Sequence, residues 1–295
     1  MAILVIGGTG QIGSLIVKEL ATRNVRATAL GHQSGGADLP SDVDLIKGDV
    51  LDVDFMRKIL RDFSTVFLLN PVVADELTRA LLVLGLAADA GIERFVYFSM
   101  INSDRFSDTP HAAAKYATEQ AIGKLKMPAS ILRPNYFFQN DVKQEMPLKR
   151  KGIYAMPIGG IGVTMVDTRD IAMTAAIELI RREQSSRPLP TEVIEIVGPD
   201  LLTGDSVAAL WSDVLDMAIS YAGDDLRPLE ELFRKQGSSV TAYDNVLMFR
   251  GFQREGMLGA PGAADRLAQR LGRPLRSYHD FAEAQAAEWK KTTKN

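Results

Sequence analysis

The sequence predicts an α/β protein in which a doubly wound parallel sheet is followed by a smaller α+β C-terminal lobe. Short β-branched runs alternate repeatedly with segments of helical periodicity, which is typical of parallel strands joined by crossover helices. A cluster of glycines separates the first expected strand from the first expected helix. After Pro134 the alternation loosens, and glycines and prolines are scattered through KGIYAMPIGGIGVTMVDTRD, which indicates the second lobe.

The expected strands are short and apolar, as strands covered by helices on both faces are. We expect them at residues 2–6, 26–30, 44–46, 65–69, 94–99 and 129–132. Helices are expected between them at 11–22, 53–63, 76–90 and 112–125, and a further helix at 168–182 is expected to return to the main sheet. The resulting main domain is 1–135 with 166–183, and the smaller lobe, for a substrate or a partner, is 136–165 with 184–295.

Composition and charge exclude several classes of protein. The 295 residues, 46% hydrophobic and 24% charged, are typical of a globular chain with a sizeable core. A net charge of −3 provides no basic surface for nucleic acid. The absence of cysteine excludes disulfides, thiolate nucleophiles and cysteine-bound metals. Because we find neither a basic leader nor an apolar run of about 18 residues, we expect a cytoplasmic protein without a membrane span.

The glycine cluster carries the clearest functional signal. Gly8, Gly10 and Gly13 satisfy GxGxxG, and Gly7, Gly10 and Gly13 equally satisfy GxxGxxG, directly between a strand and a helix. In that setting the missing side chains permit a tight turn, and backbone amides at the helix start can touch a pyrophosphate. A mononucleotide P-loop would need lysine where Ser14 stands. We expect the dinucleotide contacts from this turn: Gly7, Thr9, Gly10, Gln11, Ile12 and Gly13.

The end of the second strand bears on which dinucleotide is bound. An NAD site commonly places a carboxylate there, whereas TALGHQSGG offers only His32 with Gln33 and Ser34. This pattern favours NADP, with NAD still possible, and His32 is equally consistent with a surface loop. After the third strand, Asp49 and Val50 either border the adenine or simply end the strand.

Ligands of open α/β sheets lie beyond the carboxyl ends of the strands. The expected fourth and fifth strands end in residues that are therefore candidates to line a nicotinamide site: Asn70, Pro71, Ser99, Met100 and Asn102.

The segment DTPHAAAKYATEQAI begins the next helix, with Thr109 as its expected N-cap and Pro110 in the first turn. His111 and Lys115 are four residues apart and so share one helix face. His111 is a candidate proton donor for a hydride transfer, and Lys115 is a candidate to bind the nicotinamide ribose and to raise the local positive potential. The alternative is an exposed helix start with both side chains solvated.

Three other places offer chemistry of lower specificity. Tyr136, after the sixth strand, either stacks on a flat ligand or belongs to the core between lobes. Asp167, Arg169 and Asp170 begin a helix, where we expect them to cap and brace it. His279 stands alone in SYHDF, far from any second ligand, so we expect no metal site.

Taken together, these segments resemble the NmrA-like group of atypical short-chain dehydrogenases/reductases. The similarity spans almost the whole chain and includes VIGGTGQIG, KGDVLDVDFMRKIL, VFLLNP, FVYFSM, KYATEQAI, SILRPNYFFQN and VDTRDIA. It implies a Rossmann-type NADP domain, a smaller C-terminal substrate lobe and a cleft between them. The segment EVIEIVGPDLLTGDSVAAL would then be the strand, turn and helix that enter the lobe.

The chain also departs from the wider group. Better-known short-chain dehydrogenases use YxxxK, whereas His111 stands here where that tyrosine would be, so the resemblance carries Lys115 over better than a catalytic tyrosine. Several NmrA-like members share this HxxxK form, and the resemblance implies either quinone and dye reductases or NADP-sensing regulators. The family often has arginine where His32 stands, which lowers the expected preference for NADP.

Two functions follow from these observations. The first is an oxidoreductase that moves a hydride from NADPH, or NADH, to a planar electrophilic small molecule such as a quinone, a dye or a conjugated carbonyl. The second is a non-catalytic NADP(H) sensor that changes its affinity for a protein partner, with a homodimer also possible. A methyltransferase using S-adenosylmethionine is disfavoured because no carboxylate ends the second strand. We also predict that Lys115→Ala lowers turnover far more than stability.

Overall fold

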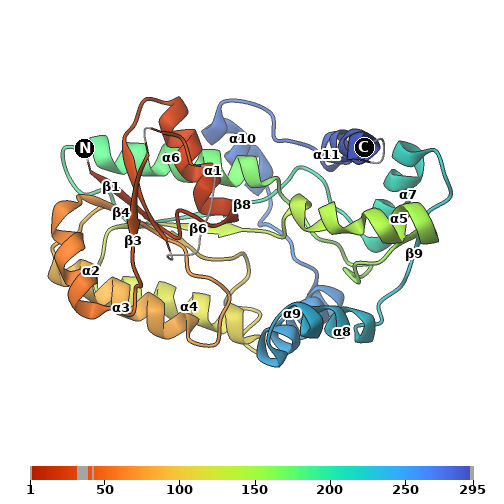
Figure 1. Ribbon diagram of the computed structural model, residues 1–295, viewed down its shortest axis with the longest axis horizontal. Coiled ribbons are helices and arrows are strands. Elements are labelled where there is room, and N and C mark those ends of the chain that lie inside the picture. Colours follow the sequence, from red (N-terminus) through yellow and green to blue (C-terminus); the bar gives the residue numbers. More distant parts are fainter. Residues whose placement is uncertain (1, 32–38, 42, 293–295) are drawn as a thin grey trace. The chain divides into compact units, whose positions relative to one another are not determined.

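A seven-stranded sheet forms the centre of the first of two units in this computed structural model. Its strands are β1 (Ile3–Ile6), β2 (Ala27–Gly31), β3 (Asp44–Lys47), β4 (Thr65–Leu68), β5 (Phe95–Phe98), β6 (Ala129–Pro134) and β8 (Glu192–Ile196). They follow the order β3-β2-β1-β4-β5-β6-β8, and the five neighbouring pairs from β3 to β6 are parallel (Figure 1). The strand order reverses between β1 and β4, the point at which doubly wound sheets bind ligands. The predicted doubly wound α/β fold is therefore confirmed.

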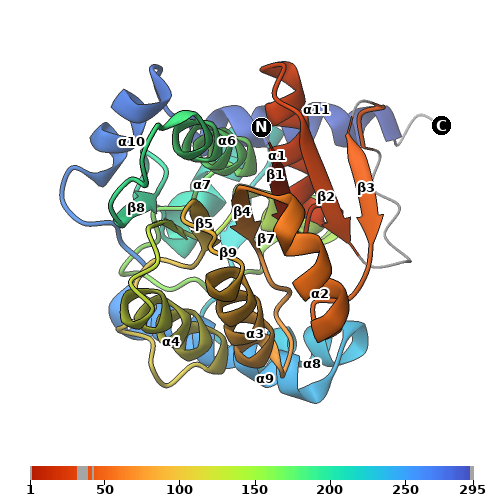
Figure 2. The same ribbon diagram turned by 90° about the vertical axis from the view of Figure 1, so that its left-hand side faces the viewer.

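Helices cover both faces of this sheet. In both views α1 (Gln11–Thr22) and α6 (Thr168–Gln184) lie on one face, and α2 (Val53–Ile59), α3 (Glu76–Asp89) and α4 (Pro110–Lys124) lie on the other (Figures 1 and 2). A short 3-10 turn, η1 (Leu60–Asp62), extends α2. Because of this double cover, every residue of β1, β4 and β5 is buried, and these strands supply much of the core.

Two strands differ from the sequence prediction. We expected each strand to be covered on both faces, but most of β3 is exposed at the edge of the sheet. We expected residues 192–196 to enter the smaller lobe, but they form β8 at the opposite edge of the main sheet. Sequence periodicity reports burial along one segment and carries no information on which distant strand a segment pairs with.

The structure describes residues 2–31, 39–41 and 43–292. Within the chain, contacts divide it into a first unit, Met1–Arg133 with Ile171–Ile194, and a second unit, Pro134–Asp170 with Glu195–Asn295. The candidate His32 lies outside the described residues. Among the helices that are described, none has the length and apolar character that a membrane crossing requires.

The second unit is mainly helical. Its two short strands, β7 (Ile153–Tyr154) and β9 (Ser220–Tyr221), pair in parallel. Thr203 caps the start of α7 (Gly204–Leu215), because its hydroxyl accepts from the Ser206 amide at 3.1 Å and its amide donates to the Ser206 hydroxyl at 2.8 Å. The helical elements are η2 (Phe138–Gln144), α5 (Glu145–Lys151), α7 (Gly204–Leu215), α8 (Arg227–Gln236), α9 (Ser239–Glu255), α10 (Ala263–Leu271) and α11 (Tyr278–Thr292).

Aromatic side chains hold the last helix within the second unit. Trp211 of α7 stacks on Trp289 of α11 with ring centroids 5.2 Å apart. Phe138 of η2 packs edge-on against Tyr278, also at 5.2 Å. These pairs join segments that are far apart in the chain, so the core of this unit depends on its C-terminal residues.

Candidate active site

The glycine turn joins β1 to α1 at the switch point of the sheet. Gly7 has φ +82°, a left-handed conformation that side chains other than glycine rarely adopt. The amides of Gly7 and Gly8 both donate to the carbonyl of Leu30, at 3.0 and 3.1 Å, which ties the turn to β2. Gly10 is the N-cap of α1 and no side chain caps the helix. The first turn of α1 is therefore left without a side-chain cap, as an anion site at a helix N-terminus requires.

The four glycines serve different purposes, which can be separated by asking what a Cβ atom would meet. At Gly13 it would lie 2.0 Å from the Gly7 carbonyl oxygen, and at Gly8 it would lie 2.7 Å from the Ala29 Cβ. Both positions are therefore required by close packing inside the unit. At Gly10 the nearest atom is the Gly7 oxygen at 3.4 Å, an ordinary contact, and the residue is exposed. The fold does not need a glycine at position 10, so the open space there is available to a bound group.

The loop after β4 completes the switch point. Asn70 is buried, and its amide nitrogen donates to the Glu76 carbonyl at 3.3 Å, which fixes the first turn of α3. Pro71 is exposed in the same loop. Asp49, after β3, accepts from the Leu51 amide and from Arg79, whereas Val50 packs on the core. Contacts from these residues to a nucleotide stay a prediction.

A buried charge cluster lies between the starts of α3 and α4. The Glu76 carboxylate places Oε2 2.6 Å from Nδ1 of His111 and Oε1 2.9 Å from Nζ of Lys115. The Lys115 contact is an ion pair without the alignment of a good hydrogen bond, and the ammonium also donates to the Phe98 carbonyl at 2.8 Å. The predicted shared face of His111 and Lys115 is thus confirmed, but the two residues meet a carboxylate that our sequence analysis did not select.

In this cluster, burial and the neighbouring groups shift the pKa values of Glu76 and Lys115 in opposite directions. Glu76 is 3% exposed and Lys115 is 2% exposed, whereas the His111 side chain is 16% exposed. Burial alone would raise the pKa of Glu76, but Lys115 and His111 outweigh it and the pKa lies below its usual value. Burial alone would lower the pKa of Lys115, but its surroundings, including Tyr97 and Glu76, hold that pKa above its usual value. Both groups therefore carry their charges near neutral pH.

Two polar residues near this cluster, Ser99 and Thr109, differ in their contacts from what the sequence analysis predicted. The Ser99 hydroxyl donates to Glu119 at 2.5 Å, and Glu119 pairs with Arg133, so the serine proton is committed to a buried network. Thr109 is the N-cap residue of α4, but its side chain makes no capping hydrogen bond and its hydroxyl is buried without a partner. Pro110 does occupy the first turn, as predicted.

Residues of the second unit that the sequence singled out have structural contacts. Tyr136 is 9% exposed and packs edge-on against Phe249 and Phe252, with each centroid distance 5.7 Å. Both partners belong to the second unit, so this packing lies within that unit, whereas the core alternative that we held for Tyr136 joined the two lobes. A contact between Tyr136 and a ligand stays a prediction.

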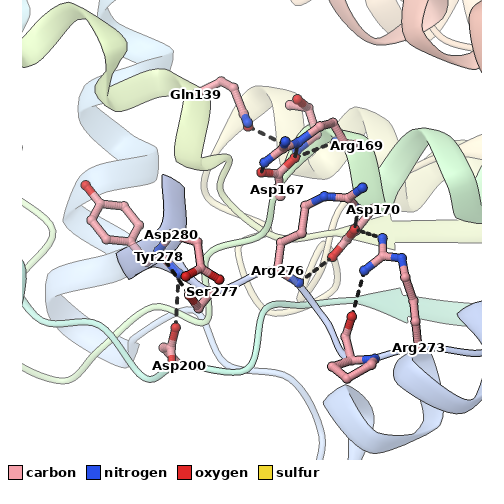
Figure 3. Close-up of polar contacts among 12 residues, drawn as sticks. Gln139, Asp167, Arg169, Asp170, Asp200, Arg273, Arg276, Ser277, Tyr278 and Asp280 are labelled. Carbon is pink, nitrogen blue, oxygen red and sulfur yellow. Dashed lines mark hydrogen bonds and ion pairs between the residues drawn. The ribbon is translucent and has the colours of Figure 1, made fainter. Parts of the chain in front are cut away.

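The charged residues at the start of α6 brace it, as expected. Asp167 accepts from the amide and the guanidinium of Arg169, and Asp170 pairs with Arg273 and Arg276 (Figure 3). Arg276 also donates its amide to Asp170 at 3.0 Å. Asp170 is 1% exposed, so its two partners join the segment before α11 to the start of α6 within the second unit.

One expectation about metal ligands was wrong. We expected His279 to lie far from any second ligand, but it is near Asp280 and Glu283, with all three ligand atoms within 4.8 Å of one another. Our sequence analysis overlooked that Glu283 is four residues beyond His279 and three beyond Asp280, the spacings at which side chains meet on a helix. All three residues are exposed, as acidic helix starts commonly are, and the cluster on its own does not indicate a metal.

The model of the NmrA-like family matches residues 1–240. The chain belongs to the NmrA-like family. This NmrA-like chain is 27% identical over 289 residues to the NAD(P)H azoreductase of Xenophilus azovorans, covering 97% of this chain and 98% of that protein.

Solved structures share the fold of this NmrA-like chain. The NADPH-dependent quinone oxidoreductase of Escherichia coli, complexed with NADPH, superposes with a TM-score of 0.81 at 17% identity, over 96% of this chain and 99% of that one. The triphenylmethane reductase of a Citrobacter species, complexed with NADP(H), gives 0.79 at 19% identity, over 97% and 100%. At these identities the likeness establishes the fold alone.

Glu76 is the site residue that sequence reasoning missed. It was identified only as the first residue of an expected helix. A carboxylate at the start of the helix that follows β4, next to the switch point, was the available signal. Its partners are 35 and 39 residues further along the chain, so the pairing itself could not be seen in the sequence.

Proposed function

We propose that this chain is an NAD(P)H-dependent oxidoreductase that passes a hydride to a planar, electrophilic small molecule such as a quinone, a dye or a conjugated carbonyl. The observation that carries the proposal is Gly10, an exposed glycine at the start of α1 that internal packing does not require. A coenzyme that brings its pyrophosphate against the backbone explains this glycine. The full-length similarity to an NAD(P)H azoreductase supports the same class of reaction.

The coenzyme would be held by the glycine turn. First-turn amides of α1 and the positive end of its dipole suit a pyrophosphate, and Gly7, Gly8 and Gly13 keep that turn compact. NADP is the expected coenzyme because no carboxylate ends β2 in the described residues, and the named solved relatives were complexed with NADPH or NADP(H). When bound, a reduced nicotinamide coenzyme supplies the hydride, that is, two electrons and one proton.

After hydride transfer, the chain's own residues would supply a proton to the acceptor and stabilise its negative charge. A neutral acceptor such as a quinone becomes an anion when it gains a hydride, and that anion needs one more proton. His111 is the candidate donor, because its side chain is the most exposed of the buried cluster. Lys115 would act through its fixed positive charge, since burial and the ion pair with Glu76 prevent it from swinging outward.

The burial of Lys115 also favours a second candidate, the NADP(H) sensor. Two polar contacts already hold its ammonium, with Glu76 and with the Phe98 carbonyl, at 2% exposure. A protein that binds the coenzyme without turnover does not need an accessible reactive group, so a buried Lys115 is consistent with a sensor.

The glycine turn gives a sharp test of the coenzyme site. Gly10→Ala is expected to fold normally, because Gly10 has φ −80° and ψ 175°, which any residue adopts, and its Cβ has room. We expect its unfolding free energy to stay within about 0.5 kcal/mol of wild type. The dissociation constant for NADPH, measured by fluorescence titration, should rise at least about tenfold because the methyl group meets the pyrophosphate.

Gly13→Ala is the matched control. Its Cβ would collide with the Gly7 carbonyl oxygen, so we expect destabilisation of about 1–3 kcal/mol or more in urea unfolding. If Gly10→Ala binds NADPH as wild type does, the proposed coenzyme site is wrong. If wild type binds NADPH but oxidises it with no quinone, azo dye, triphenylmethane dye or enone, the sensor replaces the reductase.

A further inference from the structure

We propose that Glu76 is the positioning residue of this site, which fixes the proton of His111 on Nδ1 and thereby makes Nε2 the atom that exchanges protons with the acceptor. The inference rests on the proposed function for its catalytic consequence. The tautomer itself does not depend on that function. Glu76 touches neither coenzyme nor acceptor in this proposal and acts only through His111.

The two oxygens of the buried Glu76 carboxylate face different partners. Oε2 lies 2.6 Å from Nδ1 of His111, and Oε1 lies 2.9 Å from Nζ of Lys115. A side chain that is 3% exposed is costly to ionise unless it is paired, and here each oxygen faces one partner. Because the Lys115 charge keeps Glu76 ionised, the carboxylate can only accept, and the proton between Glu76 and His111 must belong to Nδ1.

The backbone of Glu76 is held as firmly as its carboxylate. Its amide donates to the Val73 carbonyl at 3.1 Å, and its carbonyl accepts from the Asn70 side chain at 3.3 Å. On the other side, the Phe98 carbonyl holds Lys115 at 2.8 Å. The carboxylate is therefore fixed by β4 through Asn70 and by β5 through Phe98, so the His111 ring has one preferred orientation.

Other ionisable groups, from β5, α3 and α4, also lie near this cluster. Tyr97 of β5 lies with its ring centroid 5.4 Å from Nζ of Lys115, and Glu119 of α4 also acts on this ammonium. Arg79 of α3 is paired with Asp75 and Asp49. Glu76 contacts both His111 and Lys115.

The proton balance of the proposed reduction follows. A quinone gains two electrons and one proton as the hydride, and takes its second proton from Nε2–H of the His111 imidazolium. His111 then becomes neutral with its proton on Nδ1, and water reprotonates Nε2. Glu76 keeps its charge throughout and stabilises the imidazolium that must be regenerated.

Glu76→Gln tests this role with an almost unchanged shape. The Lys115 ammonium must attract the amide oxygen, so the amide NH2 group turns to Nδ1 of His111. That donor requires a lone pair on Nδ1, and the proton of neutral His111 should move to Nε2. We expect the ¹⁵N NMR pattern of neutral His111 to switch from the Nδ1–H to the Nε2–H tautomer; the chain has only 3 histidines, which makes assignment direct.

The same variant has a kinetic signature that mere destabilisation would not produce. With a quinone as acceptor, kcat should fall at least about tenfold while the KM for NADPH stays unchanged. Glu178→Gln is the control, because Glu178 is also buried and ion-paired in the first unit, with Arg181 at 2.6 Å. We expect it to lose stability and to leave the His111 tautomer and the KM for NADPH unchanged.

The outcomes separate this proposal from the proposed function. An Nε2–H tautomer of neutral His111 in wild type overturns the role of Glu76, even if Glu76→Gln fails to fold. A wild-type Nδ1–H tautomer that switches in Glu76→Gln supports the role. If that switch occurs while wild type binds NADPH and reduces no acceptor, the reductase fails and the positioning of His111 stands.

Discussion

Lys115→Ala is expected to destabilise the first unit by about 3–5 kcal/mol in urea unfolding, because removing one partner of a buried ion pair strands the other charge. Glu76 would remain 3% exposed with only His111 beside it. This changes our prediction from the sequence, which gave Lys115→Ala a large effect on turnover and a small one on stability. At 2% exposure, Lys115 supports the fold directly.

A double variant separates the stability lost through an unpaired buried charge from the stability lost through poorer packing. Lys115→Met with Glu76→Gln removes both charges and keeps similar volumes, so most of the lost stability should return. The measurement is a double-mutant cycle of unfolding free energies from urea titrations. If Lys115→Ala alone is as stable as wild type, the buried ion pair does not hold the starts of α3 and α4 together.

The parts of the fold that the sequence predicted depend on local rules. Helix α1 was predicted with the bounds it has, because glycines at its start and apolar residues at helical spacing lie within one short segment. Strands β1 to β6 were located because each is a short apolar run, which is also a signal within one segment. The shared face of His111 and Lys115 followed from their spacing of four residues along α4.

The parts that were missed depend on pairing across the chain. β8 joins the sheet with help from Arg182, a buried residue of α6 that donates to Ser130 of β6 and to the carbonyls of Leu189 and Pro190, just before β8. The contact between Ser130 and Arg182 joins residues that are 52 positions apart in the chain. Glu76 was missed for the same physical reason, since nothing near it in the sequence shows which residues will neutralise its charge.

The second unit contains a buried carboxyl group that no local pattern indicated. Asp141 of η2 accepts hydrogen bonds at Oδ2 from the hydroxyls of Tyr154, at 2.9 Å, and Tyr278, at 2.5 Å. Its Oδ1 is buried without a partner, and the whole residue is inaccessible to solvent. Burial raises the pKa of Asp141 from 3.8 to about 7, against the two tyrosine hydrogen bonds, which lower it.

We therefore expect the second unit to lose stability as the pH rises. The folded chain binds the Asp141 proton more tightly than the unfolded chain does, so the contribution is complete below about pH 4 and is lost through about pH 7. At 1.36 kcal/mol per pKa unit the total change is about 4 kcal/mol. Carboxylates with lowered pKa values, such as Glu76 and Asp167, act in the opposite direction, but only at more acidic pH.

Asp141→Asn isolates this effect, because asparagine keeps an acceptor for both tyrosines and cannot ionise. Its urea midpoint should match wild type near pH 5 and exceed it near pH 8. Tryptophan fluorescence reports this unit selectively, because the chain has 2 tryptophans, both in the second unit, and Trp211 donates to the Tyr278 hydroxyl at 3.1 Å. Equal pH dependence in the two proteins would mean that Asp141 is ionised in the folded state throughout this range, with the two tyrosines compensating its charge.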